Sequence, residues 1–226
     1  MSGARMRWRR FAERQYNAGA VPRTQTSLGK WISDARFSDN IAAQQLVAGG
    51  IATELARSFG VDPYGLRLDS KLRVEGAATK SDVLGAGGYG RLVLDGTVSR
   101  PFGRYALAIT GAGGASGGDV PVQRGFYMGG LHTVRGQFAR PTGDGRVGAT
   151  FWLGRAEPGS PFRALRPAFF YDLGWAGARD DLARGRPLSG AGAGLSFLDG
   201  LFRLDVARGI HPEKGWRTDL HIGARF

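Results

Sequence analysis

The sequence predicts an all-β fold, and specifically an antiparallel β-barrel whose strands span a membrane. The segment from Trp216 to Phe226 alternates strictly, with apolar or small side chains on one parity and mostly charged ones on the other. Successive side chains of a strand point to opposite faces, so this segment has one apolar and one charged face. The chain also contains 38 glycines. It has no run of about 18 apolar residues, which a membrane-spanning helix would need.

Eight strands are predicted between residues 65 and 226, because apolar and polar residues alternate there with a period of two. Long helical periodicity is weak. The predicted apolar faces carry Leu66, Leu68, Leu72 and Val74; Leu92, Leu94 and Val98; Tyr105, Leu107 and Ile109; Val147, Ala149, Phe151 and Leu153; Leu165, Phe169, Tyr171, Leu173 and Trp175; Leu195 and Phe197; Phe202, Leu204 and Val206; and Trp216, Leu220, Ile222 and Phe226.

The pattern is weaker before residue 65. Arg5–Ala18 and Gln45–Phe59 are predicted as two further strands, joined by a long loop. The second of these also fits a helical period, and we prefer the strand. Asp62-Pro63-Tyr64-Gly65 is typical of a short turn. The total is then ten strands, an even number as transmembrane barrels of single chains have.

The connections are predicted to alternate in length. Short turns are expected near Arg100–Gly103, Ala156–Pro161 and Asp199–Gly200. Longer loops are expected near Gly76–Gly85, Gly111–Gly145, Trp175–Gly185 and Arg208–Gly215. Short turns on one side and long loops on the other are typical of outer-membrane barrels.

The net charge of +12 comes almost entirely from arginine. A basic chain can indicate a nucleic-acid partner, but these arginines alternate with apolar residues instead of forming a patch. A lipid-facing arginine at the bilayer midplane costs ~2–4 kcal/mol, so the charged faces are expected to line the lumen. A soluble barrel shows the same period with the opposite facing, and the period alone does not separate the two.

Residues 1–226 are expected to form one barrel domain. Cysteine is absent, which excludes disulfides and thiolate metal sites. No secretory signal is visible in the first residues, although an outer-membrane protein needs one. We therefore expect the chain to be the C-terminal part of a longer protein and of a larger barrel.

Two motifs stand in order along the chain. The longest predicted loop contains Met128-Gly129-Gly130-Leu131-His132-Thr133-Val134-Arg135-Gly136, and Phe170-Tyr171-Asp172-Leu173-Gly174 follows two strands later. These resemble the lumen-loop and strand motifs of the BamA/TamA-type outer-membrane assembly-factor family (the bacterial surface antigen barrel). The chain end at Ile222, Gly223 and Phe226 is similar to the closing strand of that family.

The resemblance implies that Arg135 of the loop motif (Val134, Arg135, Gly136) is held inside the barrel by Asp172 of the strand motif (Phe170, Asp172, Gly174). A guanidinium can bind a carboxylate through two hydrogen bonds, and Asp172 has the predicted lumen parity. The sequence departs from the family pattern at Gln137, where an aromatic residue is usual. It departs again at Thr150, where some members have a second carboxylate. We therefore expect weaker aromatic packing at the loop tip and a single acidic partner for Arg135.

The resemblance implies an integral protein of a Gram-negative type of outer membrane that assembles or translocates other proteins, with no bond chemistry, cofactor or metal. Its implied partners are outer-membrane lipid, unfolded outer-membrane proteins and periplasmic or lipoprotein accessory factors, with no nucleic acid. A two-partner secretion transporter, the barrel anchor of a patatin-like lipase fusion and a soluble ligand-binding barrel remain as alternatives. Gly85, Gly87 and Gly90 match a dinucleotide-binding spacing, but they lack the strand–turn–helix context of such a site.

Overall fold

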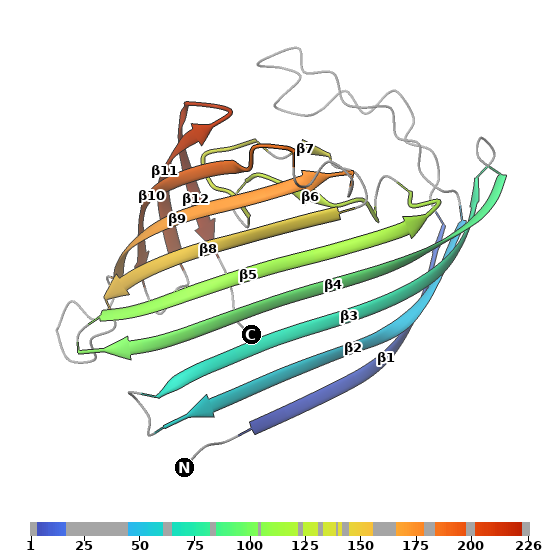
Figure 1. Cartoon of the computed structure of the whole chain (residues 1–226), viewed down its shortest axis with the longest axis horizontal. Coiled ribbons are helices and arrows are strands. Elements are labelled where there is room, and N and C mark those ends of the chain that lie inside the picture. The colour runs from blue at the N-terminus through green and yellow to red at the C-terminus, as the bar shows by residue number, and fades with distance from the viewer. Residues whose placement is uncertain are drawn as a thin grey trace.

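The computed structural model of the chain is built almost entirely from antiparallel β-strands (Figure 1). It describes residues 4–16, 45–60, 65–81, 85–103, 105–121, 124–130, 133–138, 140–141, 145–155, 166–178, 184–197 and 202–222. The strands are β1 (Ala4–Tyr16), β2 (Gln45–Phe59), β3 (Leu66–Ser81), β4 (Gly85–Phe102), β5 (Tyr105–Gly118), β6 (Tyr127–Met128), β7 (Arg140–Pro141), β8 (Gly145–Arg155), β9 (Arg166–Gly177), β10 (Leu188–Phe197), β11 (Phe202–His211) and β12 (Trp216–Ile222).

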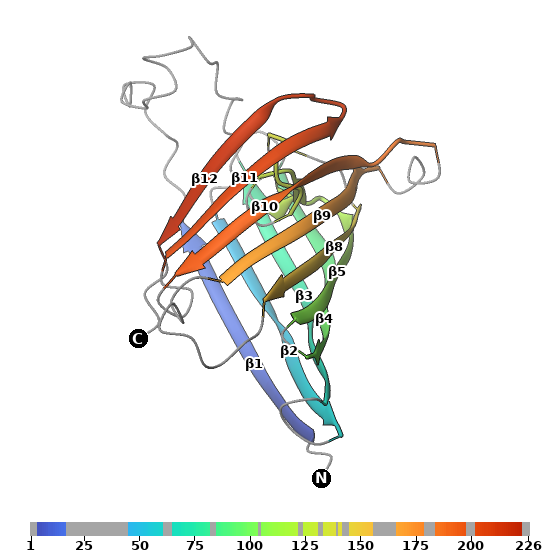
Figure 2. The same ribbon diagram turned by 90° about the vertical axis from the view of Figure 1, so that its left-hand side faces the viewer.

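Ten of these strands form one sheet in the order β1-β2-β3-β4-β5-β8-β9-β10-β11-β12, so each strand pairs with its neighbours along the chain. The prediction of ten antiparallel strands is confirmed, and Gln45–Phe59 is a strand and not a helix. The short β6 and β7 form a separate two-stranded sheet that was not predicted. Across the described residues no ladder joins β1 to β12, so the sheet is an open, strongly curved trough (Figures 1 and 2).

The apolar side chains of the sheet lie on its convex, exposed face. Phe169 is 67% exposed and Ile222 61% exposed, whereas Phe170 and Asp172, on the other parity of β9, are buried. The prediction that the apolar side chains point outward is therefore confirmed. The same face carries Met6, Trp8, Val47, Ile51, Leu72, Val74, Leu92, Leu94, Val98, Leu107, Ile109, Phe151, Leu153, Leu195, Leu204, Val206 and Leu220, each at least about a third exposed.

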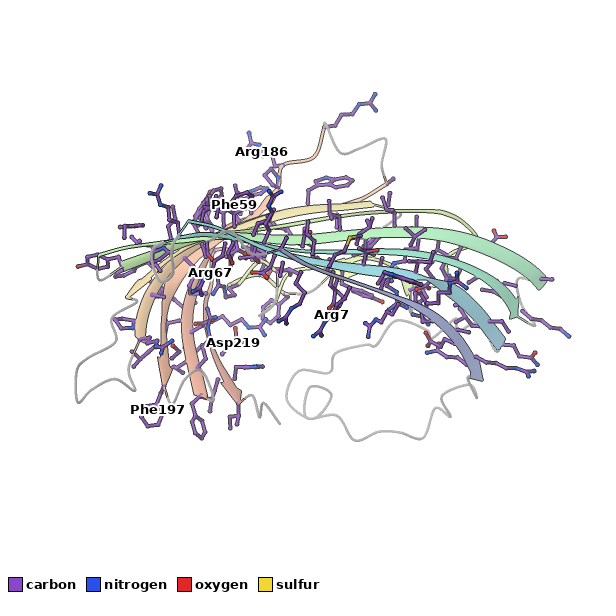
Figure 3. The ribbon with its side chains drawn as sticks, turned by 90° about the horizontal axis from the view of Figure 1, so that it is seen from below. Arg7, Phe59, Arg67, Arg186, Phe197 and Asp219 are labelled. Carbon is purple, nitrogen blue, oxygen red and sulfur yellow. The ribbon has the colours of Figure 1, made fainter. Side chains whose placement is uncertain are left out.

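Most charged side chains of the sheet lie on the concave face of the trough; Arg10, opposite Ile51, and Arg208, opposite Trp216, are exceptions on the convex parity. Figure 3 shows Arg7 and Asp219 on the concave side; Arg7 belongs to β1 and Asp219 to β12, the two edge strands of the sheet. The ladder places Arg7 opposite Glu54 and Glu54 opposite Lys71, so cross-strand neighbours alternate in sign. Lys71 Nζ lies 3.2 Å from Glu54 Oε1. Opposite charges on neighbouring strands stabilise a sheet modestly.

Several predicted loops are shorter than expected, because the strands continue through glycine-rich segments. β3 runs to Ser81 and β4 begins at Gly85, so the long loop predicted at Gly76–Gly85 is wrong. β5 includes Gly111 to Gly118, β9 runs to Gly177 and β11 to His211, which shortens the other three predicted loops. Glycine removes the apolar alternation that marks a strand, but its backbone still pairs in the ladder.

The predicted short turns are only partly described. β4 continues to Phe102, so the turn to β5 begins only at Gly103 (φ 57°), the last residue of the predicted range Arg100–Gly103. The described part of β8 ends at Arg155 and that of β9 begins at Arg166, so the predicted turn at Ala156–Pro161 is not tested. Residues 61–64, 156–165 and 198–201, which hold most of the predicted turn residues, lie outside the described part of the chain.

Candidate functional site

The segment between β5 and β8, here called the inner loop (residues 119–144), carries Arg135, and its described residues contact the concave side of the trough. The structure brings Arg135 and Asp172 together as the sequence motifs implied. Arg135 Nε donates to Asp172 Oδ2 at 2.7 Å, and Nη2 donates to Oδ1 at 2.8 Å. The backbone N–H of Arg135 also donates to Oδ2, at 3.0 Å. The guanidinium and the carboxylate therefore form a forked, two-bond ion pair, with the loop backbone held by the same carboxylate.

A second carboxylate also binds Arg135, which the sequence analysis missed. Arg135 Nη1 lies 3.2 Å from Oδ2 of Asp205 on β11. Arg203 Nε donates to Oδ1 of the same carboxylate at 2.9 Å. The expectation of a single acidic partner, based on Thr150, is wrong. The second carboxylate comes from β11, two strands away from Asp172, and not from the strand that carries Thr150.

The ion pair is almost completely shielded from solvent. The side chain of Arg135 is 6% exposed, that of Asp172 0% and that of Asp205 1%. The ring of Phe170 lies under the guanidinium, with Cζ of Arg135 3.3 Å from the ring centroid. A cation stacked on a desolvated ring gains about 2 kcal/mol or more. The aromatic residue of the strand motif is thus a platform for the loop arginine, although it faces the polar side of the sheet.

Small residues on the wall give the inner loop room to approach. A Cβ on Gly190, directly opposite Asp172 in the ladder, would overlap the carbonyl oxygen of Arg135. A Cβ on Gly174 would lie 2.5 Å from Met128 Sδ and 2.7 Å from Val134 Cγ2. Val134 and Met128 are both buried. Gly174 of the strand motif is therefore needed for the close packing of the loop, and Gly190 serves the same purpose beside it.

The turn of the loop motif depends on left-handed backbone at Gly136. Its φ is 83°, and a Cβ there would also lie 2.6 Å from the backbone nitrogen of Gly209. Gly130, at φ 90°, donates its N–H to the carbonyls of Val134 and Gln137, at 3.1 and 2.8 Å. This local network presents the Arg135 side chain toward β9. Leu131 and His132 of the motif lie outside the described residues.

Gln137 stands where the resemblance would place an aromatic residue, and it is held by hydrogen bonds instead of ring packing. It is 1% exposed, and its Nε2 donates to the carbonyls of Ser189 and Glu213 at 2.9 and 3.0 Å. The backbone N–H of Glu213 donates to Oε1 of Gln137 at 3.3 Å. The amide therefore joins the loop tip to β10 and to the β11–β12 turn. Phe138, the next residue, is 67% exposed, with Arg217 lying 5.5 Å from the centroid of its ring.

A second cluster of buried charge lies on the wall formed by β1 to β4. Glu75 is 2% exposed and accepts a hydrogen bond of 2.6 Å from the Tyr89 hydroxyl. Arg73 Nη2 donates to Oε2 of Glu75 at 2.8 Å. The inner loop supplies Arg124, whose Nη2 lies 2.8 Å from Glu13 Oε2 and whose Nη1 lies 3.8 Å from Glu75 Oε1. Burial disfavours the charged form of the Arg124 guanidinium, but the neighbouring Glu13 and Glu75 carboxylates outweigh that effect and raise its pKa.

The predicted closing strand is described only in part. Ile222 ends β12 on the exposed apolar parity, whereas Gly223 and Phe226 lie outside the described residues. Within the described ranges no group of three or more potential ligands is placed to hold a metal ion. The same ranges contain no helix of the length and apolar character that would cross a bilayer. What the site offers chemically is a set of buried arginine–carboxylate contacts that hold one loop against two walls.

No known protein family matches the sequence. No curated protein matches it either. Among solved structures, the fold is similar to CdiB from Acinetobacter baumannii, with a TM-score of 0.40 and 15% sequence identity over 97% of this chain. The chain spans 47% of the length of that structure. A likeness of this degree does not define a family.

Proposed function

We propose that the chain is an integral outer-membrane β-sheet protein of the BamA/TamA type, which assists the insertion or translocation of other outer-membrane proteins. The observation that carries this proposal is the contact between the two sequence motifs. Arg135 of the loop motif binds Asp172 of the strand motif on the polar side of a sheet whose other side is apolar. The resemblance to the family rests on those two motifs, and their contact is the one that it implied.

The dimensions of the apolar face support a membrane setting. On β3 the outward parity is uncharged from Leu66 to Ala78, and on β4 from Ala86 to Val98. At ~3.3 Å per residue each stretch is about 40 Å long. A strand tilt of ~45° reduces that length to about 30 Å of depth, which matches the hydrocarbon core. Outward charges follow directly, at Lys80 on β3 and Arg100 on β4, where the strands would leave the bilayer.

The proposed activity uses the edges of the open sheet and requires no covalent step. β12 is an edge strand, and its outward side chains Trp216, Leu220 and Ile222 are each more than 60% exposed. An edge presents unpaired backbone N–H and C=O groups, to which an incoming strand can add. An amphipathic strand of an unfolded outer-membrane protein would match both faces, with apolar residues toward lipid and polar residues toward the trough.

Reconstitution with an unfolded client tests this function. The chain is inserted into liposomes, a urea-unfolded outer-membrane protein is added, and its folding is followed by the shift of the folded band in an unheated gel. We expect folding to be several-fold faster than in liposomes without the chain. Equal rates in the two sets of liposomes, with the chain shown to be inserted, would contradict the proposal. Acceleration limited to one dedicated client would favour a two-partner secretion transporter.

A further inference from the structure

The inner loop is held at a second point, at Arg124, which precedes the loop motif in the chain and contacts the opposite wall of the trough. Arg124 contacts Glu13 on edge strand β1 and Glu75 on β3. Arg135 contacts Asp172 on β9 and Asp205 on β11. Each arginine thus binds two carboxylates, and each pair of carboxylates comes from two different strands of its wall.

The second attachment is also largely shielded from solvent, although its contacts with carboxylates are fewer and longer than those of Arg135. The Arg124 side chain is 14% exposed and that of Glu75 is 1% exposed. Phe126, two residues later in the loop, is 1% exposed, and the guanidinium of Arg91 lies 4.7 Å from the centroid of its ring. A Cβ on Gly114 of β5 would lie 2.6 Å from that ring. Arg124 therefore lies between the carboxylates of Glu13 and Glu75. Phe126, near it in the loop, packs against the backbone of β5 at Gly114, which has no side chain.

We propose that Arg124 is a second positioning residue of the inner loop. The loop, bound to one wall through Arg124 and to the other through Arg135, then acts as a strut: it fixes the distance between the β1–β3 wall and the β9–β11 wall. A sheet of paired strands resists stretching along its ladders, but its twist and curvature vary over a wide range. In the described residues the two walls are linked through the sheet only by β4, β5 and β8. A rigid crosspiece between them removes that freedom.

Releasing either arginine has a predictable consequence. A buried carboxylate that loses its cation is left uncompensated, and this state is strongly disfavoured. Glu75 retains Arg73 and Tyr89 when Arg124 is removed, so the wall itself is expected to stay folded while the strut detaches. The attachment of the loop to the two walls does not depend on whether the chain assembles other proteins.

The separation of the two walls can be measured directly. The chain has no cysteine, so Val74→Cys on β3 and Val206→Cys on β11, both on the exposed convex face, can carry two spin labels. Pulsed dipolar spectroscopy then reports the distance between the walls. We expect a narrow distribution in the parent chain. In R124Q the distribution should widen or shift by several ångströms, and chymotryptic cleavage after Phe126, which is buried two residues from Arg124, should become faster.

The matched control is K71Q, which removes an ion pair between neighbouring strands whose side chains are 48% and 46% exposed. This control should leave both the distance and the cleavage unchanged. If R124Q does not fold, E13Q removes the more exposed partner of Arg124 and should widen the distribution by itself. The proposal would be overturned if folded R124Q, or folded E13Q where R124Q does not fold, had the distance distribution and the cleavage rate of the parent chain.

Discussion

Replacing Asp172 by asparagine is expected to release the inner loop and to destabilise the folded chain by about 3–5 kcal/mol. The carboxylate accepts three hydrogen bonds from Arg135, one of them from the backbone. Asparagine replaces one acceptor oxygen by an NH₂ group, and arginine offers only donors, so a donor would face a donor. The contact with Asp205 at 3.2 Å remains, which places the loss at the lower end of this range.

The measurement for D172N combines urea unfolding in detergent, followed by the heat-modifiable gel band, with tryptic cleavage of the inner loop. The control is D219N on β12. The pair of Asp219 with Arg217 joins two residues of the same strand, and its side chains are 14% and 31% exposed, so its loss should cost at most about 1 kcal/mol. If D172N and D219N unfold at the same urea concentration and have the same cleavage pattern, Arg135 is not held by Asp172.

A methyl group at Gly190 is expected to have an effect as large as the loss of the carboxylate. The Cβ of G190A would overlap the backbone carbonyl of Arg135, and backbone atoms cannot rotate away as a flexible side chain can. Overpacking alone costs ~1–3 kcal/mol. The loop must also lift from the wall, and this breaks the contact between Arg135 and Asp172. We therefore expect G190A to expose the loop to trypsin although it removes no charge.

Gly113 provides the matched control for this substitution. It lies on β5 of the same sheet, and a Cβ there would have no atom within 4 Å. G113A should leave both the urea midpoint and the tryptic pattern close to those of the parent chain. Equal behaviour of G190A and G113A would mean that the loop does not approach the wall as closely as the structure shows.

The sequence was sufficient for the strands and for their facing, because a half-buried strand has a period of two. Phe169 and Asp172 already lay on opposite parities, and they occupy opposite faces of β9. The loop lengths were overestimated where Gly111 to Gly118 continues β5. In that segment the backbone ladder persists, but side chains large enough to show alternation are absent.

Of the candidate site, only the contact between the loop motif and the strand motif was predictable from the sequence. Arg135 and Asp172 could be paired by resemblance, whereas Asp205 and Glu75 were recognisable only as charges of lumen parity. Their role depends on register and on where the inner loop contacts the trough, and neither is encoded locally. A useful signal was the row of glycines on β10, since Gly190, Gly192 and Gly194 face the polar side and leave space there.

The central claim is that the convex face meets hydrocarbon and the concave face meets water. Neighbouring residues of β3 test it most directly: Leu72, 37% exposed, and Lys71, with its side chain 48% exposed. Single cysteines at these positions differ in facing far more than in exposure. With the chain in liposomes, a fluorophore on L72C should be quenched by lipids carrying nitroxide on their acyl chains, whereas K71C should react with a membrane-impermeant thiol reagent. The opposite pattern, with L72C open to the aqueous reagent and K71C quenched from the lipid, would contradict the account.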